Sequence, residues 1–248
     1  MMHDRMMSYY LKLLENRVKF SRTDLLEAMK GSGIEISEAS FKITLQKLLK
    51  NGLIVRVGRN AYCVAQNGTE VYSYEYSKDA RNVAFFLEEK FPYLDFTIMD
   101  FVQLNEFVNH QLAHNVIFVS VEGDLGKFVF DALKEIYPGK VLINPTPEIY
   151  HQYWYEGMIV VCKLISESPM GKNEKWNTRI EKLLVDVLTN SILQSSISKS
   201  ELPNIYEEAF AKYAIDESCM FRYAKRRGAE KKIREFINKN TNIQLRMG

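Results

Sequence analysis

Cysteine is scarce in this sequence, and the way it is spaced excludes two classes of small stabilised domain. Cys63, Cys162 and Cys219 are far apart, and no CxxC pair occurs. An odd number of widely separated cysteines argues against a disulfide framework and against a zinc finger. The sequence therefore predicts a protein of the reducing cytoplasm, without a structural metal.

Long apolar runs are also missing. No segment approaches the roughly 20 apolar residues that span a bilayer. The first residues, MMHDRMMSYYLKLLENRVKF, carry scattered charges and lack the apolar block and cleavage site of a signal peptide. With 46% hydrophobic and 26% charged residues, the composition is that of a globular domain, and we expect no membrane partner.

Charge is present in ordinary amount but is unevenly distributed. Residues 1–65 carry 11 Lys+Arg and 6 Asp+Glu (11 − 6 = +5), and residues 66–221 carry 13 and 23 (13 − 23 = −10). Residues 222–248 carry 9 and 2 (9 − 2 = +7). Two basic ends around an acidic middle favour a polyanionic partner, although solvated lysine-rich helices would give the same composition.

The first 66 residues have the pattern of a winged helix-turn-helix. Apolar spacing predicts helices over 3–15, 22–30 and 38–51, with Ser21 and Ser37 as N-caps of the second and third. LIVRV and AYCVA then flank the turn residues GRN, which predicts a hairpin. We assign residues 1–66 to this module.

Residues 70–248 are predicted to form a larger α/β domain with a helical C-terminal tail. A helix is expected over 77–89. The runs DFTIMDF, NVIFVSVE, KVLIN and MIVVCKLI alternate with expected helices over 104–114, 124–136 and 147–153. This alternation predicts a mostly parallel sheet covered by helices. A helix over 179–193 and helices from Leu202 to about Asn238, broken at Gly228, complete the α+β and α/β architecture.

The outward side of the third helix is the candidate DNA-binding surface. On a wheel of about 100° per residue, the side predicted to face inward carries Phe41, Leu45, Leu48 and Leu49. The candidate DNA-binding residues are Ser40, Lys42, Ile43, Thr44, Lys47 and Lys50 on this helix, with Arg56, Arg59 and Asn60 on the hairpin. Small modules of this plan also serve as protein–protein modules, which is the alternative role.

Four patterns in the sequence could indicate catalysis. His110 and His114 have helical spacing without the glutamate base of H-E-x-x-H. VEGDLGK lacks phosphate-loop spacing. Asp95, Glu122 and Lys163 lie on or beside successive strands, where a metal-dependent nuclease site is built, but the E-x-K pattern is absent. No cysteine has a nearby histidine to activate it. The sequence predicts a non-enzyme with no catalytic or metal-ligating residues and no cofactor.

A dense cationic segment occupies the tail. It contains Arg222, Lys225, Arg226, Arg227, Lys231 and Lys232. These side chains form a possible second basic surface for phosphates. Alternatively, they pair with the acidic middle of the chain, within one molecule or across a dimer.

Three motifs together resemble the AbiEi-type antitoxins, which are transcriptional regulators of bacterial type IV toxin–antitoxin (abortive infection) systems. The hairpin VGRNAYCV has the basic residue, turn residue and tyrosine of that group in Arg59, Asn60 and Tyr62, with Asn60 where glycine is common. RIEKLLVDVL (179–188) is similar to its ER-LL-D helix, and RYAKRRG (222–228) to the tail of one branch. The middle of this chain has more βαβ character than the better-known members.

The resemblance implies two activities. The N-terminal domain would bind inverted repeats in its own promoter, as a monomer or a dimer on DNA, and repress transcription. The rest of the chain would neutralise a nucleotidyltransferase toxin without requiring a stable complex. The alternatives are a metal-dependent nuclease or nucleotide-acting enzyme with a DNA-binding module, and a protein–protein adaptor.

Overall fold

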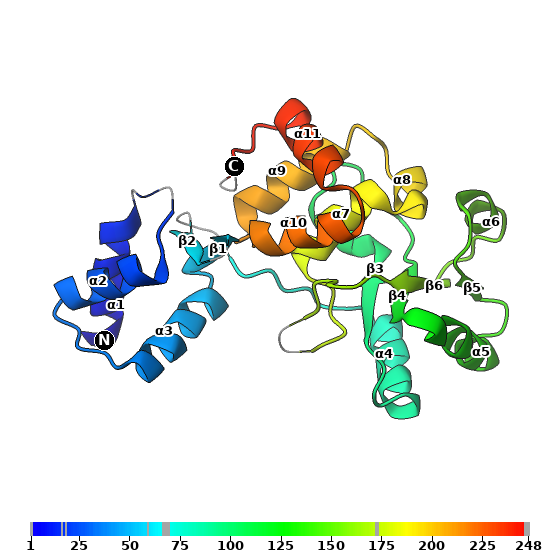
Figure 1. Cartoon of the computed structure of the whole chain (residues 1–248). Coiled ribbons are helices and arrows are strands. Elements are labelled where there is room, and N and C mark those ends of the chain that lie inside the picture. Colours follow the sequence, from blue (N-terminus) through cyan, green and yellow to red (C-terminus); the bar gives the residue numbers. More distant parts are fainter. Residues whose placement is uncertain are drawn as a thin grey trace.

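The chain folds as an α+β protein with a mixed four-stranded sheet and a set of C-terminal helices (Figure 1). The computed structural model describes residues 2–15, 17, 19–58, 60–65, 70–171 and 174–245. None of the helices in these ranges combines the length and the apolar character that crossing a bilayer requires.

The N-terminal module contains three helices and a two-stranded antiparallel hairpin, seen at the left of Figure 1. The elements are α1 (Met2–Glu15), α2 (Arg22–Gly31), α3 (Glu38–Lys50), β1 (Ile54–Gly58) and β2 (Ala61–Val64). All five were predicted from the sequence to within two residues. Phe20, just before α2, pairs with Tyr62 of the hairpin, which joins the helices to the strands.

Both predicted N-caps are confirmed. Ser21 accepts a hydrogen bond from the backbone N–H of Asp24, and the Asp24 side chain accepts one from the N–H of Ser21. Ser37 accepts from the N–H of Ser40 at the start of α3. These contacts satisfy amides that have no partner inside the helix and so fix where α2 and α3 begin.

The sheet has the strand order β3-β4-β6-β5 and is mixed, so the prediction of a mostly parallel sheet was too simple. Its strands are β3 (Phe96–Asp100), β4 (Ile117–Glu122), β5 (Val141–Ile143) and β6 (Ile159–Leu164). β4 and β5 each pair with β6 in parallel, whereas β3 pairs with β4 in antiparallel.

The helix expected over residues 104–114, between β3 and β4, does not form. Only the short 3-10 helix η1 (Phe101–Glu106) lies between β3 and β4, and residues 107–116 are irregular. The side chain of Asn105 both accepts from the N–H of Leu112 and donates to its carbonyl, which holds this segment in a loop. Residues 101–116 form no crossover helix, and the chain returns beside β3 in the antiparallel direction.

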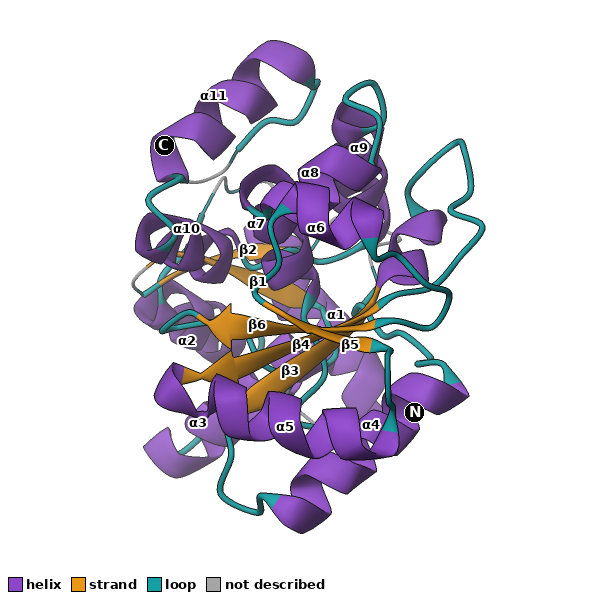
Figure 2. Ribbon diagram, turned by 90° about the vertical axis from the view of Figure 1, so that its right-hand side faces the viewer, coloured by secondary structure: helices purple, strands orange, loops and turns teal. Residues whose placement is uncertain are grey.

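Helices cover both faces of the sheet (Figure 2). α4 (Lys78–Lys90) and α5 (Gly126–Ile136), which is preceded by the 3-10 turn η2 (Gly123–Leu125), pack on the face that carries Ile98, Val119 and Val161. The opposite face, which carries Met99, Phe118 and Val160, packs against the C-terminal helices and α6 (Pro147–Gln152).

The C-terminal region is helical, as predicted, but has more breaks than its pattern indicated. It contains α7 (Ile180–Thr189), α8 (Ser191–Ser196), α9 (Leu202–Lys212), α10 (Glu217–Arg226) and α11 (Glu230–Asn240). The expected break at Gly228 is confirmed. The expected single helix over 179–193 is interrupted at Asn190, and a further break at residues 213–216 separates α9 from α10.

The N-terminal module meets the rest of the chain at the hairpin. Val55 and Cys63 are buried in a small apolar cluster with Ala61 and Ala214. Beyond the hairpin, the N–H of Glu70 donates to the carbonyl of Lys212 (2.8 Å), and the N–H of Ala214 donates to the carbonyl of Glu70 (2.9 Å). The chain leaving the hairpin is therefore tied to the segment between α9 and α10.

Candidate nucleic-acid interface

Helix α3 presents two chemically different sides. Phe41, Leu45 and Leu48 are buried in the core of the N-terminal module, against residues of α1 and α2. Their spacing leaves the opposite side of the helix without core contacts. On that side Ser40, Lys42, Ile43, Lys47 and Lys50 are exposed and Thr44 is half-buried. The predicted orientation of α3 is therefore confirmed.

The lysines on the outward side of α3 differ in whether they form an ion pair. Lys42 forms an ion pair with Glu38 one turn earlier (3.2 Å), and the Thr44 hydroxyl donates to the carbonyl of Ser40 (2.9 Å). Within the described part of the chain, neither Lys47 nor Lys50 forms an ion pair or a side-chain hydrogen bond. Lys47 and Lys50 are thus the ammonium groups of α3 most available to an anion.

The hairpin turn is held by a contact that the sequence did not reveal. Asn60 has a positive φ of 54°, a left-handed backbone that asparagine tolerates better than most residues. Its side-chain oxygen accepts from the N–H of Arg22 (3.2 Å), and Arg22 Nε donates to the Tyr62 hydroxyl (3.2 Å). Arg22 is therefore an exposed cation beside the hairpin, brought there by a tertiary contact with no local sequence signal.

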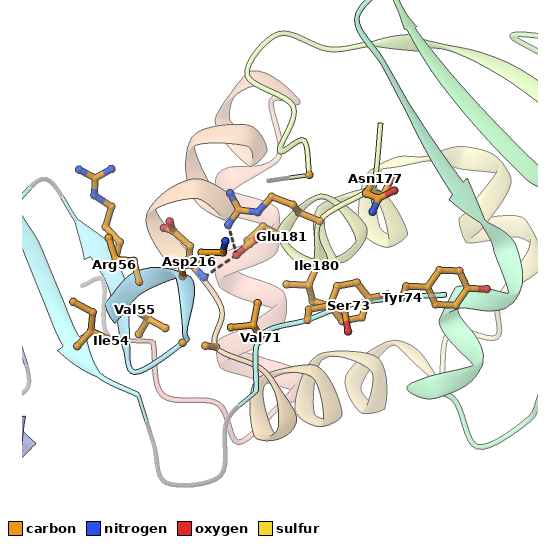
Figure 3. Close-up of a pocket in the computed structure, with 18 of the residues that line it drawn as sticks. Ile54, Val55, Arg56, Val71, Ser73, Tyr74, Asn177, Ile180, Glu181 and Asp216 are labelled. Carbon is orange, nitrogen blue, oxygen red and sulfur yellow. Dashed lines mark hydrogen bonds and ion pairs between the residues drawn. The ribbon is translucent and has the colours of Figure 1, made fainter. Parts of the chain in front are cut away.

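Arg56 lies at the junction with the α/β domain. It is exposed on β1, and together with Lys50 it lines a pocket whose other wall includes Asp216 (Figure 3). Arg56 is close enough to Asp216 to favour the charged form of that carboxylate. The structure thus groups Lys50 with Arg56 and places Lys42, Ile43 and Lys47 on the free side of α3. Arg59 lies outside the described residues.

The possible second basic surface is largely paired within the molecule. Arg222 and Arg226 both contact Glu167 (3.2 and 2.5 Å), and hydrogen bonding from Arg226 lowers the pKa of that carboxyl. Arg227 donates to the Thr189 hydroxyl at 2.9 Å. Lys232 donates to the carbonyl of Leu188 at 2.7 Å, and Lys231 lies 3.9 Å from Glu235. Lys225 is exposed.

The three residues considered for a nuclease site are not brought together. Asp95 and Glu122 are neighbours, since the N–H of Glu122 donates to the carbonyl of Asp95 (3.2 Å). Lys163 is paired with Val121, so its side chain belongs to the sheet face opposite Glu122. The lysine that does approach is Lys175, 2.5 Å from Asp95.

The two histidines considered as a pair lie on irregular chain rather than on a helix. His110 contacts Glu201 (2.6 Å), whereas His114 lies 3.8 Å from Glu156 and packs edge-on against Trp154. Among the described residues, no three His, Cys, Asp or Glu side chains form a group that could hold a metal ion.

The cysteines have the character of buried structural thiols. None of Cys63, Cys162 and Cys219 forms a disulfide bond within the described part of the chain. Burial raises the pKa of both Cys162 and Cys219 to about 11, so these thiols are protonated near neutral pH. The thiolate is the nucleophilic form, and burial outweighs the nearby cations, among them Arg179, which donates to Cys219 Sγ at 3.7 Å.

Comparison with known proteins places the chain in a family. A family model described as a family of unknown function (DUF6577) matches residues 40–243. The chain belongs to the DUF6577 family. The match begins within α3 and includes the hairpin, the sheet and all the C-terminal helices. The matched region therefore contains most of α3 together with the junction between the two parts of the chain.

Other comparisons add little to this assignment. No curated protein matches the chain. Among solved structures, the crystal structure of RV2827C protein from Mycobacterium tuberculosis is similar at 11% identity over 97% of this chain and 83% of that chain, with a TM-score of 0.25. An overlap of this size carries no argument about fold or function.

Proposed function

We propose that this DUF6577 chain binds double-stranded DNA through its N-terminal module, which acts as a winged helix-turn-helix. The observation that carries the proposal is the exposed outward side of α3, where neither Lys47 nor Lys50 forms an ion pair or a side-chain hydrogen bond with any residue that the structure describes. The major groove, about 12 Å wide, admits an α-helix. Ser40, Ile43 and Lys47 would approach base edges, while Lys42 and Lys50 would contact phosphates.

The charge of the module supports the same function. Residues 1–65 carry a net charge of +5 (11 − 6) in a chain whose middle region is acidic. A helix that offers unpaired ammonium groups next to a hairpin gives phosphates a binding surface without further rearrangement. Arg22, held beside the hairpin turn through Tyr62, would add a cation to this surface.

The biological role proposed here extends the DNA-binding activity. By resemblance to AbiEi-type antitoxins, the chain would repress its own promoter at inverted repeats and counteract a nucleotidyltransferase toxin encoded beside it. Inverted repeats present two equivalent half-sites, so the repressor would occupy them with two copies.

The DNA-binding activity is tested by fluorescence anisotropy on the promoter fragment with the full chain. Wild type should bind with a log–log salt slope of about −0.9 for each phosphate contacted. The double variant Lys42→Gln, Lys47→Gln should lower the steepness of this slope by about 1, because the Lys42 phosphate contact is lost, and should weaken binding further on the promoter sequence, because the Lys47 base contact is lost. Lys78→Gln on α4 is the control and should behave as wild type. Unchanged affinity in the double variant would contradict the assigned surface.

The antitoxin role is tested separately by growth. Co-expression with the neighbouring nucleotidyltransferase should restore growth that the toxin alone arrests. The Lys42→Gln, Lys47→Gln variant should still rescue growth when both proteins are expressed from a foreign promoter, because neutralisation is assigned to the rest of the chain. Failure of the wild-type chain to rescue growth would remove the antitoxin role and leave the DNA-binding proposal standing.

A further inference from the structure

A pocket lies at the junction between the N-terminal module and the α/β domain. It has a volume of about 240 Å³. One wall comes from the end of α3 and from β1, and the other from residues 71–76, 177–181 and 216 (Figure 3). Pockets at the boundary between two folded units are common sites for small ligands, and this volume is below the range that holds drug-sized molecules.

The wall from the α/β domain is rich in hydrogen-bond acceptors. Glu181 is only 2% exposed, and its Oε1 accepts from Arg179 (2.9 Å) and from the N–H of Asp216 (2.9 Å). Its second oxygen, Oε2, and the side-chain oxygen of Asn177 have no hydrogen-bond partner among the described residues. A buried acceptor without a donor is costly, so this wall favours a ligand that brings N–H groups.

Asp216 adds a second carboxylate to the same wall. Its Oδ1 accepts from the N–H of Cys219 and caps α10. Burial raises the pKa of Asp216, because the carboxylate is held away from water. Arg179 donates to Glu181 and also favours the charged form of Asp216. This wall thus holds two carboxylates and one guanidinium, so a ligand ammonium group would find more acceptors than donors there.

The opposite wall carries positive charge. Lys50 and Arg56 are exposed there, and within the described part of the chain neither side chain forms an ion pair. In Figure 3 the side chains of Arg56 and Asp216 come from facing elements, and Arg56 favours the charged form of Asp216. A ligand carboxylate would be held by Lys50 and Arg56, and the planar guanidinium could bind it through two hydrogen bonds.

We propose that this pocket binds a small zwitterion of the free α-amino acid class. The ammonium group would face Glu181 and Asp216, and the carboxylate would face Lys50 and Arg56. A nucleotide or inorganic phosphate fits less well, because the two carboxylates would repel it. Binding as proposed does not require DNA, so its test is independent of the proposed DNA-binding function.

The test uses the full-length chain without DNA. The standard L-amino acids are screened one at a time by thermal shift, and each positive is measured by isothermal titration calorimetry. At least one should raise the melting temperature at millimolar concentration. Its amide, which lacks the carboxylate, and its N-acetyl derivative, which lacks the ammonium, should each bind at least about tenfold more weakly.

Variants of each wall locate the binding site. Arg56→Gln, at an exposed position, and Asp216→Asn, which preserves the helix cap, should each weaken binding at least about tenfold. Lys47→Gln, on the free side of α3, is the matched control and should bind as wild type. The proposal is overturned if no amino acid stabilises the chain, if AMP or inorganic phosphate binds instead, or if either wall variant keeps wild-type affinity.

Discussion

At the scale of single residues, the interior behind the sheet contains charged side chains that the apolar pattern of residues 179–193 does not predict to be buried. Glu181, Lys182 and Asp186 on α7 are 2%, 4% and 6% exposed. Lys182 forms an ion pair with Asp186, which also accepts from the Tyr223 hydroxyl (2.9 Å). Removing one partner of such a pair leaves an uncompensated buried charge, so these residues fix how α7 packs against α10.

Asp216 gives a prediction about pH. Because burial raises its folded-state pKa above that of the unfolded chain, its contribution to stability is present at low pH and is lost as the pH rises through the folded pKa. Asn at this position keeps the N-cap acceptor without a charge. Asp216→Asn should therefore be more stable than wild type at neutral pH.

The same comparison in acid provides the control. Below the unfolded-state pKa of Asp216, about 3.9, the side chain is protonated in both the folded and the unfolded wild type, so the destabilising effect of its charge should disappear. Urea unfolding at neutral and acidic pH measures both values. A variant less stable than wild type at neutral pH would show that the charge of Asp216 stabilises the fold.

At the scale of secondary-structure elements, the break between α7 and α8 depends on one side chain. Asn190 accepts from the N–H groups of Ile192 and Leu193 and so caps α8 in the middle of a continuous apolar pattern. The cap lets the chain turn after Thr189, and Ile192 and Leu193 are then buried in the core that covers the sheet.

Asn190→Ala should lower the unfolding free energy by about 1 kcal/mol, because the first amides of α8 lose their acceptor. Asn190→Ser, which retains a capping oxygen, should lie within a few tenths of a kcal/mol of wild type. Equilibrium urea unfolding compares the two variants. Equal stability of the Ala and Ser variants would show that the cap does not determine this break.

Local signals predicted elements far better than they predicted contacts between elements. The caps at Ser21 and Ser37 and the hairpin could be placed because they depend on neighbouring residues. The irregular segment after η1 could not be predicted from the sequence. Leu104 and Phe107 have helical spacing and are both buried, but no helix continues beyond Glu106. Arg22 and the junction pocket were missed because their partners are distant in sequence.

At the scale of the whole molecule, comparing two glycines distinguishes the cost of backbone strain from the cost of disturbing the contact between the N-terminal module and the rest of the chain. Gly33 and Gly52 both have positive φ, 77° and 66°. A Cβ at Gly33 would meet open space, whereas a Cβ at Gly52 would lie 2.8 Å from Val71 Cγ2, at the point where the N-terminal module meets residues 71–76.

Gly33→Ala should lower the unfolding free energy by about 1 kcal/mol, through backbone strain alone. Gly52→Ala should cost more, because Val71 must also move. Adding Val71→Ala should reduce the cost of Gly52→Ala to that of Gly33→Ala, as measured in a double-mutant cycle. An equal loss of unfolding free energy in Gly33→Ala and Gly52→Ala would mean that Val71 moves aside at no measurable cost.

The pairing of Glu70 with Lys212 and Ala214 has a consequence during translation. Glu70 leaves the ribosome 142 positions before Lys212 (212 − 70), which corresponds to roughly 7 to 28 s at about 5–20 residues per second. The first three helices and the hairpin therefore emerge on the nascent chain well before their docking surface exists. A repressor of its own promoter would have its DNA-reading part synthesised before the part that fixes its orientation.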